Sequence, residues 1–444
     1  MTNVLTPTNV IEANNSARLI SEFVLQKPPS CVQFVPSCDY PNYLVVGTYE
    51  LEREQSDDLE ADAPMDEDCM DLDHSTPQQQ VRSGSIFLLE YTDSQLRLVD
   101  SFECPSAVYD LQFLEGDTAI FVTASSTGTI SFYFVGETQG IPGPQIKLLW
   151  ISQVLPTHTI ITYLEIVSTE LSVFGPLIAA TTNTGGVYLM SYSLEERSVQ
   201  LLNNDMPLTR HCIPRTNQMP DNAWCCASIC DNGQNEVLKI LSGSDGGILK
   251  SVILPVSNFV PRINFENHLQ TETHRFHFAG LTAILPLPLI LEGSELILTG
   301  SYDERVRLYS LRLRRVLAEI SLGGGVYRLR LVRQYLIGKS SYIVLATCMH
   351  AGTKVLEVDV KVSSGECNIN VVATLGVLEE GDYSYAADFQ PLDLPEDQDY
   401  KQLCVSGTWL DKKLRVWDYN CEAEDRSLAG EISGLVTSFK DTSM

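Results

Sequence analysis

LTGSYDERVRLYSLR, the stretch from Leu298 to Arg312, has the pattern of two β-strands joined by a tight turn. An apolar run ends at Thr299 and small residues follow. The segment Val306–Ser310 then alternates apolar and polar side chains, as a half-buried strand does. Asp303 suits the turn because its carboxylate can accept hydrogen bonds from nearby backbone N–H groups. The stretch therefore predicts an antiparallel hairpin within a larger sheet.

The same order of strand, small-residue turn and strand recurs seven times along the chain. The repeats begin at Leu44, Phe121, Ile178, Ile240, Leu298, Leu345 and Val405. Successive turns lie roughly 50 to 60 residues apart, against ~40–45 for a typical WD repeat, which indicates long loops. Trp417-Asp418 supplies a Trp-Asp dipeptide, and helical periodicity is nearly absent. We therefore expect an all-β chain that forms a seven-bladed WD-repeat β-propeller.

An inner strand is also needed in each blade, and a suitable segment precedes each turn. These segments begin at Cys31, Val108, Ile161, Ala223, Leu281, Val326 and Tyr385. We expect Leu19–Leu25 to pair as the outer strand of the last blade, because this removes a free sheet edge. The tail after Cys421 is the competing candidate. The propeller is predicted to span residues 15–420, with a C-terminal tail at 421–444.

One acidic segment, residues 52–82, does not fit a blade. Twelve acidic residues and one arginine lie between Glu50 and Asp73. Such a run cannot bury a core, so we predict a disordered acidic insertion in the first blade. Two interpretations remain open for it: a tolerated loop, or an acidic arm that attracts a basic partner.

Composition limits the kinds of partner. The chain has 444 residues, 44% of them hydrophobic, and a formal net charge of −27. That charge argues against nucleic acid and anionic membrane surfaces as partners. The twelve cysteines lack the spacing of a disulfide framework, and we see no signal peptide or membrane span. We therefore expect a cytoplasmic monomer.

Several conspicuous polar residues have a structural explanation. His277, Ser301 and Asp303 could suggest a catalytic triad, but with Tyr309 they fit the network of buried hydrogen bonds that stabilises WD-repeat blades. No G-x-S-x-G nucleophile motif is present. The cysteines at 225, 226 and 230 have no C-x-x-C spacing, so no metal is expected.

Residues at the mouth of the central channel are better candidates for function. Alignment of the blades on their outgoing strands places one turn residue per blade there: Glu50 or Tyr49, Ser126, Asn183, Asp245, Tyr302, His350, and Leu410 or Trp409. Asp245, Tyr302 and His350 would then lie on one side, with groups suited to acid–base chemistry. The alternative interpretation is that His350 is a solvated surface side chain with no catalytic role.

The first residues of the inner strands add four further candidates near the same mouth: Asp110, Trp224, Arg328 and Asp388. Arg328 follows the glycines at 323–325, which allow close approach of a ligand to the backbone. An arginine there could hold a carboxylate or an oxyanion. The alternative is that Arg328 pairs with an acidic residue of a neighbouring blade.

Together these stretches resemble the diphthine methyl esterase family of WD-repeat proteins, also named diphthine methyltransferases. The resemblance covers roughly residues 15–420, and its most specific parts are GSYDE at 300–304, GGVYR at 324–328 and CMHAG at 348–352. Tyr309 and Tyr327 stand where the family usually has tryptophan. The resemblance implies hydrolysis of the methyl ester of diphthine methyl ester on translation elongation factor 2. The products are diphthine and methanol, in diphthamide biosynthesis.

The family substrate implies roles for the candidate residues. His350 would act as general base on water, with Asp245 in the same constellation, and Arg328 would face the oxyanion. The substrate carries a trimethylammonium group, which carboxylate and aromatic side chains would bind: Tyr302, Trp224, Asp388 and Asp110. No cofactor is implied. A non-catalytic scaffold for protein assembly is the alternative, since most WD-repeat propellers bind proteins.

Overall fold

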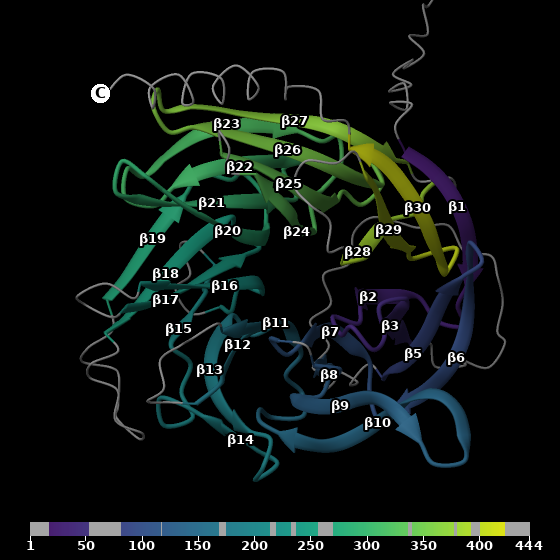
Figure 1. Cartoon of the computed structure of the whole chain (residues 1–444). Helices are drawn as coiled ribbons and strands as arrows, with labels where there is room; N and C mark the ends of the chain where they lie inside the picture. The colour runs from purple at the N-terminus through teal and green to yellow at the C-terminus, as the bar shows by residue number, and fades with distance from the viewer. Residues whose placement is uncertain are drawn as a thin grey trace, which may run out of the picture.

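The computed structural model describes residues 17–52, 81–116, 118–167, 175–213, 219–231, 237–255, 270–335, 340–376, 380–391 and 400–421. Within them every regular element is a β-strand, and seven antiparallel sheets stand in a ring (Figure 1). This confirms the predicted all-β, seven-bladed propeller. No helix in this part of the chain is long and apolar enough to cross a membrane. The predicted insertion at 52–82 and the tail at 421–444 lie almost wholly outside the described residues.

The strands of the first four blades follow chain order from the inside outward. Blade 1 consists of β2 (Pro29–Phe34), β3 (Tyr43–Thr48), β5 (Arg82–Thr92) and β6 (Gln95–Cys104), with β4 (Glu50–Leu51) beside β5. Blade 2 consists of β7 (Val108–Phe113), β8 (Ile120–Ser125), β9 (Thr129–Thr138) and β10 (Ile141–Gln153). Blade 3 consists of β11 (Ile161–Val167), β12 (Leu177–Thr182), β13 (Gly186–Ser193) and β14 (Ser198–Leu201), and β15 (Thr209–Arg210) also pairs with β13. Blade 4 consists of β16 (Ala223–Asp231), β17 (Val237–Ser244), β18 (Ile248–Pro255) and β19 (Gln270–Arg275).

The remaining blades complete the ring. Blade 5 consists of β20 (Leu281–Leu291), β21 (Ser294–Ser301), β22 (Arg305–Ser310) and β23 (Arg315–Ser321). Blade 6 consists of β24 (Arg328–Tyr335), β25 (Ser340–Thr347), β26 (Thr353–Lys361) and β27 (Glu366–Leu375). Blade 7 consists of β28 (Ser384–Phe389), β29 (Tyr400–Thr408), β30 (Lys413–Cys421) and β1 (Ala17–Val24).

Closure of the ring joins the two ends of the described chain. The strand β1 pairs antiparallel with β30, with Leu19 opposite Trp417. Arg18 adds an ion pair of 2.6 Å to Asp418. In Figure 1 the purple β1 lies along the yellow β30. The expectation that an N-terminal strand supplies the outer edge of the last blade is confirmed.

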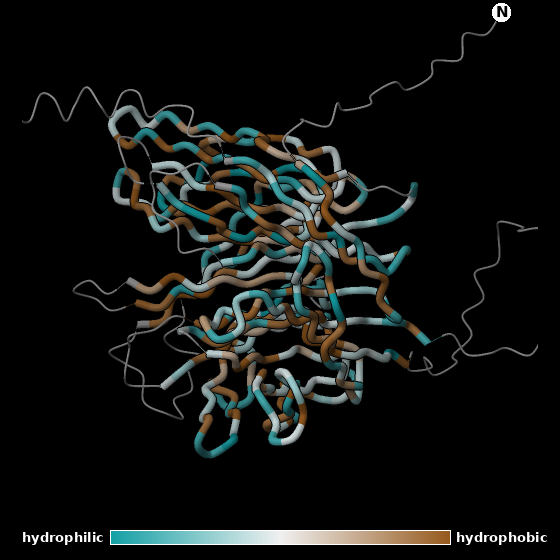
Figure 2. Tube along the Cα trace, turned by 45° about the vertical axis from the view of Figure 1, so that its right-hand side comes forward, coloured by the Kyte–Doolittle hydropathy of each residue, from teal (hydrophilic) through white to brown (hydrophobic). Residues whose placement is uncertain are grey.

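The hydrophobic core lies between neighbouring blades. Leu345 and Val355 of blade 6, for example, pack in one cluster with Cys404 and Trp417 of blade 7. Trp417 is fully buried, and its indole N–H donates to the Ser406 hydroxyl at 2.8 Å. Figure 2 shows hydrophobic and hydrophilic residues mixed along the strands. Successive side chains of a strand point to opposite faces of its sheet, so the two kinds of residue can lie on different faces.

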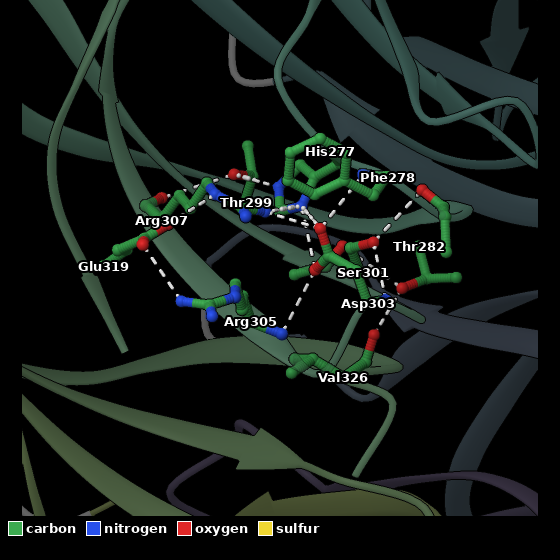
Figure 3. A network of polar contacts seen from close by, with 12 residues as sticks. His277, Phe278, Thr282, Thr299, Ser301, Asp303, Arg305, Arg307, Glu319 and Val326 are labelled. Atoms are coloured by element: carbon green, nitrogen blue, oxygen red, sulfur yellow. Dashed lines mark hydrogen bonds and ion pairs between the residues drawn. The ribbon is translucent and has the colours of Figure 1, made fainter. Parts of the chain in front are cut away.

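The turn of blade 5 is held by a buried polar network (Figure 3). The His277 ring bonds Asp303 through Nδ1 at 3.0 Å and Thr299 through Nε2 at 2.9 Å. Although burial acts to raise it, the hydrogen bonds to His277 and Arg307 hold the pKa of Asp303 well below its usual value. These contacts support a structural role for His277 and Asp303.

Two members of the expected network do not bond His277. The Ser301 hydroxyl donates to the Ala279 carbonyl at 3.1 Å, so Thr299 takes the place beside His277. Tyr309 bonds His274 at 3.1 Å instead of joining the His277 network. The arrangement therefore has no serine bonded to His277, as a catalytic triad would need.

Candidate functional site

Irregular register at the start of the inner strands builds the channel mouth. In β7, β16 and β28 the pairing skips one residue, which leaves Tyr109, Trp224 and Tyr385 without a cross-strand partner. Such a bulge redirects the side chain of the extra residue. The three aromatic side chains all line the same cavity at the channel mouth.

This cavity has a volume of about 370 Å³, and we call its lining the aromatic mouth. It consists of Ser30, Tyr49, Tyr109, Trp224, Tyr302, Tyr327, Tyr385 and Trp409. Neighbouring rings are in edge-on or tilted contact, with centroids 5.1 Å apart for Tyr49 and Tyr109 and 5.1 Å for Tyr49 and Trp409. The series continues through Tyr385, whose ring lies 5.9 Å from Trp409 and 5.0 Å from Tyr327. Five of the rings, from Tyr109 to Tyr327, therefore form a continuous arc.

Asp245 stands at the rim of the aromatic mouth. Its carboxylate is exposed and accepts hydrogen bonds from the Trp224 indole and, at 2.9 Å, from the Asn222 amide. Gly280 permits this packing, because a Cβ at that position would lie 2.8 Å from the Tyr302 ring and 3.3 Å from Asp245. Asp245, Trp224 and Tyr302 are thus brought together as the sequence predicts.

Arg328 lies deeper in the channel, in a second cavity of about 230 Å³. The two cavities share Ser30 and Tyr385 as lining residues, so they adjoin. The guanidinium lies over two tyrosine rings, 4.2 Å from the centroid of Tyr327 and 4.7 Å from that of Tyr163. These contacts place a fixed positive charge directly below the aromatic mouth.

Asp110 lines this deeper cavity, and its carboxylate also ties two blades together. Oδ2 accepts the backbone N–H of Leu164 on β11 at 2.9 Å. Burial raises the pKa of Asp110, and the charge of Arg328 opposes that rise. The predicted pairing of Arg328 with an acidic residue of another blade is therefore electrostatic, since no ion pair between them is found among the described residues.

Asp388 lies away from the aromatic mouth, so its predicted position there is wrong. Its Oδ2 accepts the Phe34 backbone N–H at 2.7 Å, and its Oδ1 pairs with Arg330 at 3.0 Å. It lines a different cavity, together with Gln33 and Glu115. Because the side chain joins β28 to β2 around the ring, its role here is to hold neighbouring inner strands together.

His350 also lies elsewhere than predicted. Strand pairing sets Leu281 opposite Ser301 in blade 5 and Arg328 opposite Thr347 in blade 6. The residue equivalent to Tyr302 is therefore Cys348, which is buried. His350 is two residues further on, is exposed, and is not among the residues that line the aromatic mouth.

A longer turn explains the displacement of His350. Seven residues, 347–353, separate the paired Ala346 and Lys354, whereas five, 301–305, separate Gly300 and Val306 in blade 5. An alignment made on the outgoing strand is therefore shifted by two residues at the start of the turn. The longer turn is anchored to blade 7, where Ser384 N–H donates to the Met349 carbonyl at 3.0 Å.

Sequence reasoning missed much of the aromatic mouth. Tyr109, Tyr327 and Tyr385 were not among the candidates, and Tyr49 and Trp409 were only alternatives at their positions. The signal that could have found three of them is an aromatic residue at or just before the start of an inner strand: Tyr109, Tyr327 and Tyr385. Among the described residues no group of His, Cys, Asp and Glu is arranged to hold a metal ion.

The fold is that of a seven-bladed WD-repeat β-propeller. Among solved structures, the crystal structure of Saccharomyces cerevisiae Sqt1, a WD-repeat protein, matches with a TM-score of 0.51 and 11% sequence identity. The match covers 91% of this chain and 99% of that chain, and at this identity it shows the fold alone. A scan against models of protein families finds no match, and a comparison with curated proteins finds none either.

Proposed function

We propose that this protein hydrolyses the methyl ester of diphthine methyl ester on translation elongation factor 2, giving diphthine and methanol. The observation that carries the proposal is the aromatic mouth with Asp245 at its rim. The sequence resemblance at GSYDE, GGVYR and CMHAG supplies the identity of the substrate. We further propose that the chain is a monomer and that it acts on the elongation factor in the cytoplasm.

The chemistry of the aromatic mouth suits the cationic part of that substrate. A trimethylammonium group carries a positive charge but cannot donate a hydrogen bond through its methylated nitrogen. Faces of tyrosine and tryptophan rings attract such a cation by roughly 0.5–2 kcal/mol each, depending on desolvation. Asp245, beside Trp224 and Tyr302, adds a full negative charge at the rim. The aromatic mouth therefore provides both ring faces and a negative charge, and both interactions favour a quaternary ammonium ion.

The deeper cavity offers groups for hydrolysis. In our proposal the ester carbonyl oxygen lies toward Arg328, whose guanidinium stabilises the negative charge of the tetrahedral intermediate. Asp110 lines the same cavity, and burial raises its pKa, which makes the carboxylate a stronger base.

The proton then moves in two steps. Asp110 takes a proton from the attacking water as the new C–O bond forms. It returns that proton to the methoxide oxygen as the ester C–O bond breaks, so methanol leaves. This assignment gives Asp110 the role of general base that the sequence suggested for His350.

Intact-mass spectrometry tests the proposal directly. Full-length protein is incubated with methyl-esterified elongation factor 2, and the substrate should lose the mass of one methylene group. Asp110→Asn should abolish that loss, because the amide cannot accept the proton. An unchanged substrate mass with folded wild-type protein would overturn the proposal.

A non-catalytic scaffold is the second candidate function, and the WD-repeat fold itself favours it. In that case the aromatic mouth would bind the modified factor without changing it. Stable binding of the ester with no change in mass, in the same incubation, is the result expected of a scaffold.

A further inference from the structure

Arg328 has one guanidinium nitrogen that is buried without a hydrogen-bond partner among the described residues. The other terminal nitrogen, Nη1, donates to the Tyr327 carbonyl at 3.1 Å. Stacking against Tyr327 and Tyr163 fixes the plane of the group, so Nη2 cannot easily turn toward water. A buried charged donor left unsatisfied costs about 1–3 kcal/mol or more, which favours an anionic ligand at this point.

The acidic groups nearby form their hydrogen bonds and ion pairs with residues other than Arg328. Asp110 accepts the Leu164 N–H, and Asp388 pairs with Arg330. Within the described residues no carboxylate forms an ion pair with Arg328. An anion that enters the deeper cavity would therefore meet a guanidinium with free donor capacity.

The two adjoining cavities have opposite electrostatic preferences. The aromatic mouth and Asp245 favour a cation, whereas Arg328 favours an anion below it. Ser30 and Tyr385 line both cavities, so one ligand can extend from one to the other. A ligand that matches both ends carries a quaternary ammonium group and a carboxylate on a short connection.

We propose that the joined cavities form a binding site for zwitterions of the betaine class, with the ammonium group in the aromatic mouth and the carboxylate on Nη2 of Arg328. The site takes free small molecules of this class. The further proposal that the natural ligand is diphthine, through its carboxylate, rests on the proposed function. The carboxylate product is then held more tightly than the neutral ester, so the reaction shows product inhibition.

Two small probes separate the contributions of the two ends. Calorimetric titration of the full-length protein compares glycine betaine with tetramethylammonium, which has the cation but no carboxylate. We expect glycine betaine to bind at least about tenfold more tightly, equivalent to ~1.4 kcal/mol from the charge-assisted contact. Equal affinities, or no binding of glycine betaine, would overturn the inference without any variant.

Amino-acid substitutions show whether Arg328 causes the preference for glycine betaine. Arg328→Met should remove the preference for glycine betaine and leave tetramethylammonium binding in place, and Arg328→Lys should restore part of the preference. Arg333→Met is the matched control, because Arg333 lies on the same strand but does not line the deeper cavity. A preference that survives in folded Arg328→Met would contradict the proposed contact.

The outcome is independent of the test for hydrolysis. If the ester is hydrolysed but the probes bind equally, the zwitterion site is wrong and the proposed function stands. If glycine betaine is preferred but the ester mass never changes, the ligand class stands and the hydrolase is wrong.

Discussion

His211 is a buried imidazole that links stability to pH at the scale of a single residue. It is 1% exposed, and its Nε2 bonds the Ser242 hydroxyl at 2.8 Å. Burial, together with the charge of Lys250, lowers the pKa of His211 to about 3. Between that value and the ordinary pKa of about 6.5, the unfolded chain binds a proton that the folded chain does not. Stability from this residue therefore falls as the pH falls through that window.

We expect His211→Gln to weaken the acid sensitivity of the protein. Between pH 7 and pH 5 the wild-type chain should lose about 2 kcal/mol of unfolding free energy through His211 alone. The glutamine has no such titration and keeps a polar group near Ser242. Urea unfolding of both proteins at the two pH values measures the difference. An identical loss in both would show that His211 is already neutral in the unfolded chain or charged in the folded one.

A second prediction at this scale concerns the turn of blade 5. Asp303→Asn removes the charge that pairs with Arg307 at 2.6 Å while both groups are nearly buried. Because the buried Arg307 guanidinium then keeps only its ion pair with the partly exposed Glu319, we expect a loss of at most about 3–5 kcal/mol in unfolding free energy. Arg305→Gln is the control, since its ion pair with Glu319 is exposed and should contribute less than about 1 kcal/mol. Equal effects in denaturant unfolding would contradict this account of the network.

At the scale of elements, the sequence pattern predicts strands and their order well. The recurring turns located all seven inner strands, because in each blade the inner strand precedes the hairpin that contains the turn. The sequence pattern could not locate Cys348 as the equivalent of Tyr302, because turn length is set by backbone pairing and not by hydrophobic period. The error in placing His350 has this single cause.

Removal of β1 should destabilise the ring. Seven residue pairs join β1 to β30, and cross-strand pairs contribute roughly 0.2–1 kcal/mol each, so deletion of residues 1–24 should cost about 1–7 kcal/mol. Deletion of residues 1–16 is the control and should leave the urea midpoint unchanged. A midpoint for the longer deletion equal to that of the full chain would contradict closure by β1.

At the scale of the whole molecule, closure into a ring decides which side chains meet. Tyr49, Trp224, Tyr327 and Trp409 come from four blades that are distant in sequence, and only the propeller brings them to one cavity. Asp245 and Arg328 could be predicted as site residues from the sequence, because each is a polar residue at a position that recurs in every blade. The aromatic residues were harder to choose, because tyrosine and tryptophan are also common in sheet cores.

The central claim is that the aromatic mouth, and not the outer turn that carries His350, is the functional site. The direct test is the steady-state rate of ester hydrolysis by folded Trp224→Ala and His350→Ala proteins, with methyl-esterified elongation factor 2 as substrate. Our account predicts that Trp224→Ala raises KM about tenfold, the loss of ~1.4 kcal/mol of cation binding, and that His350→Ala retains wild-type kinetics. Loss of turnover in His350→Ala with wild-type kinetics in Trp224→Ala would contradict it.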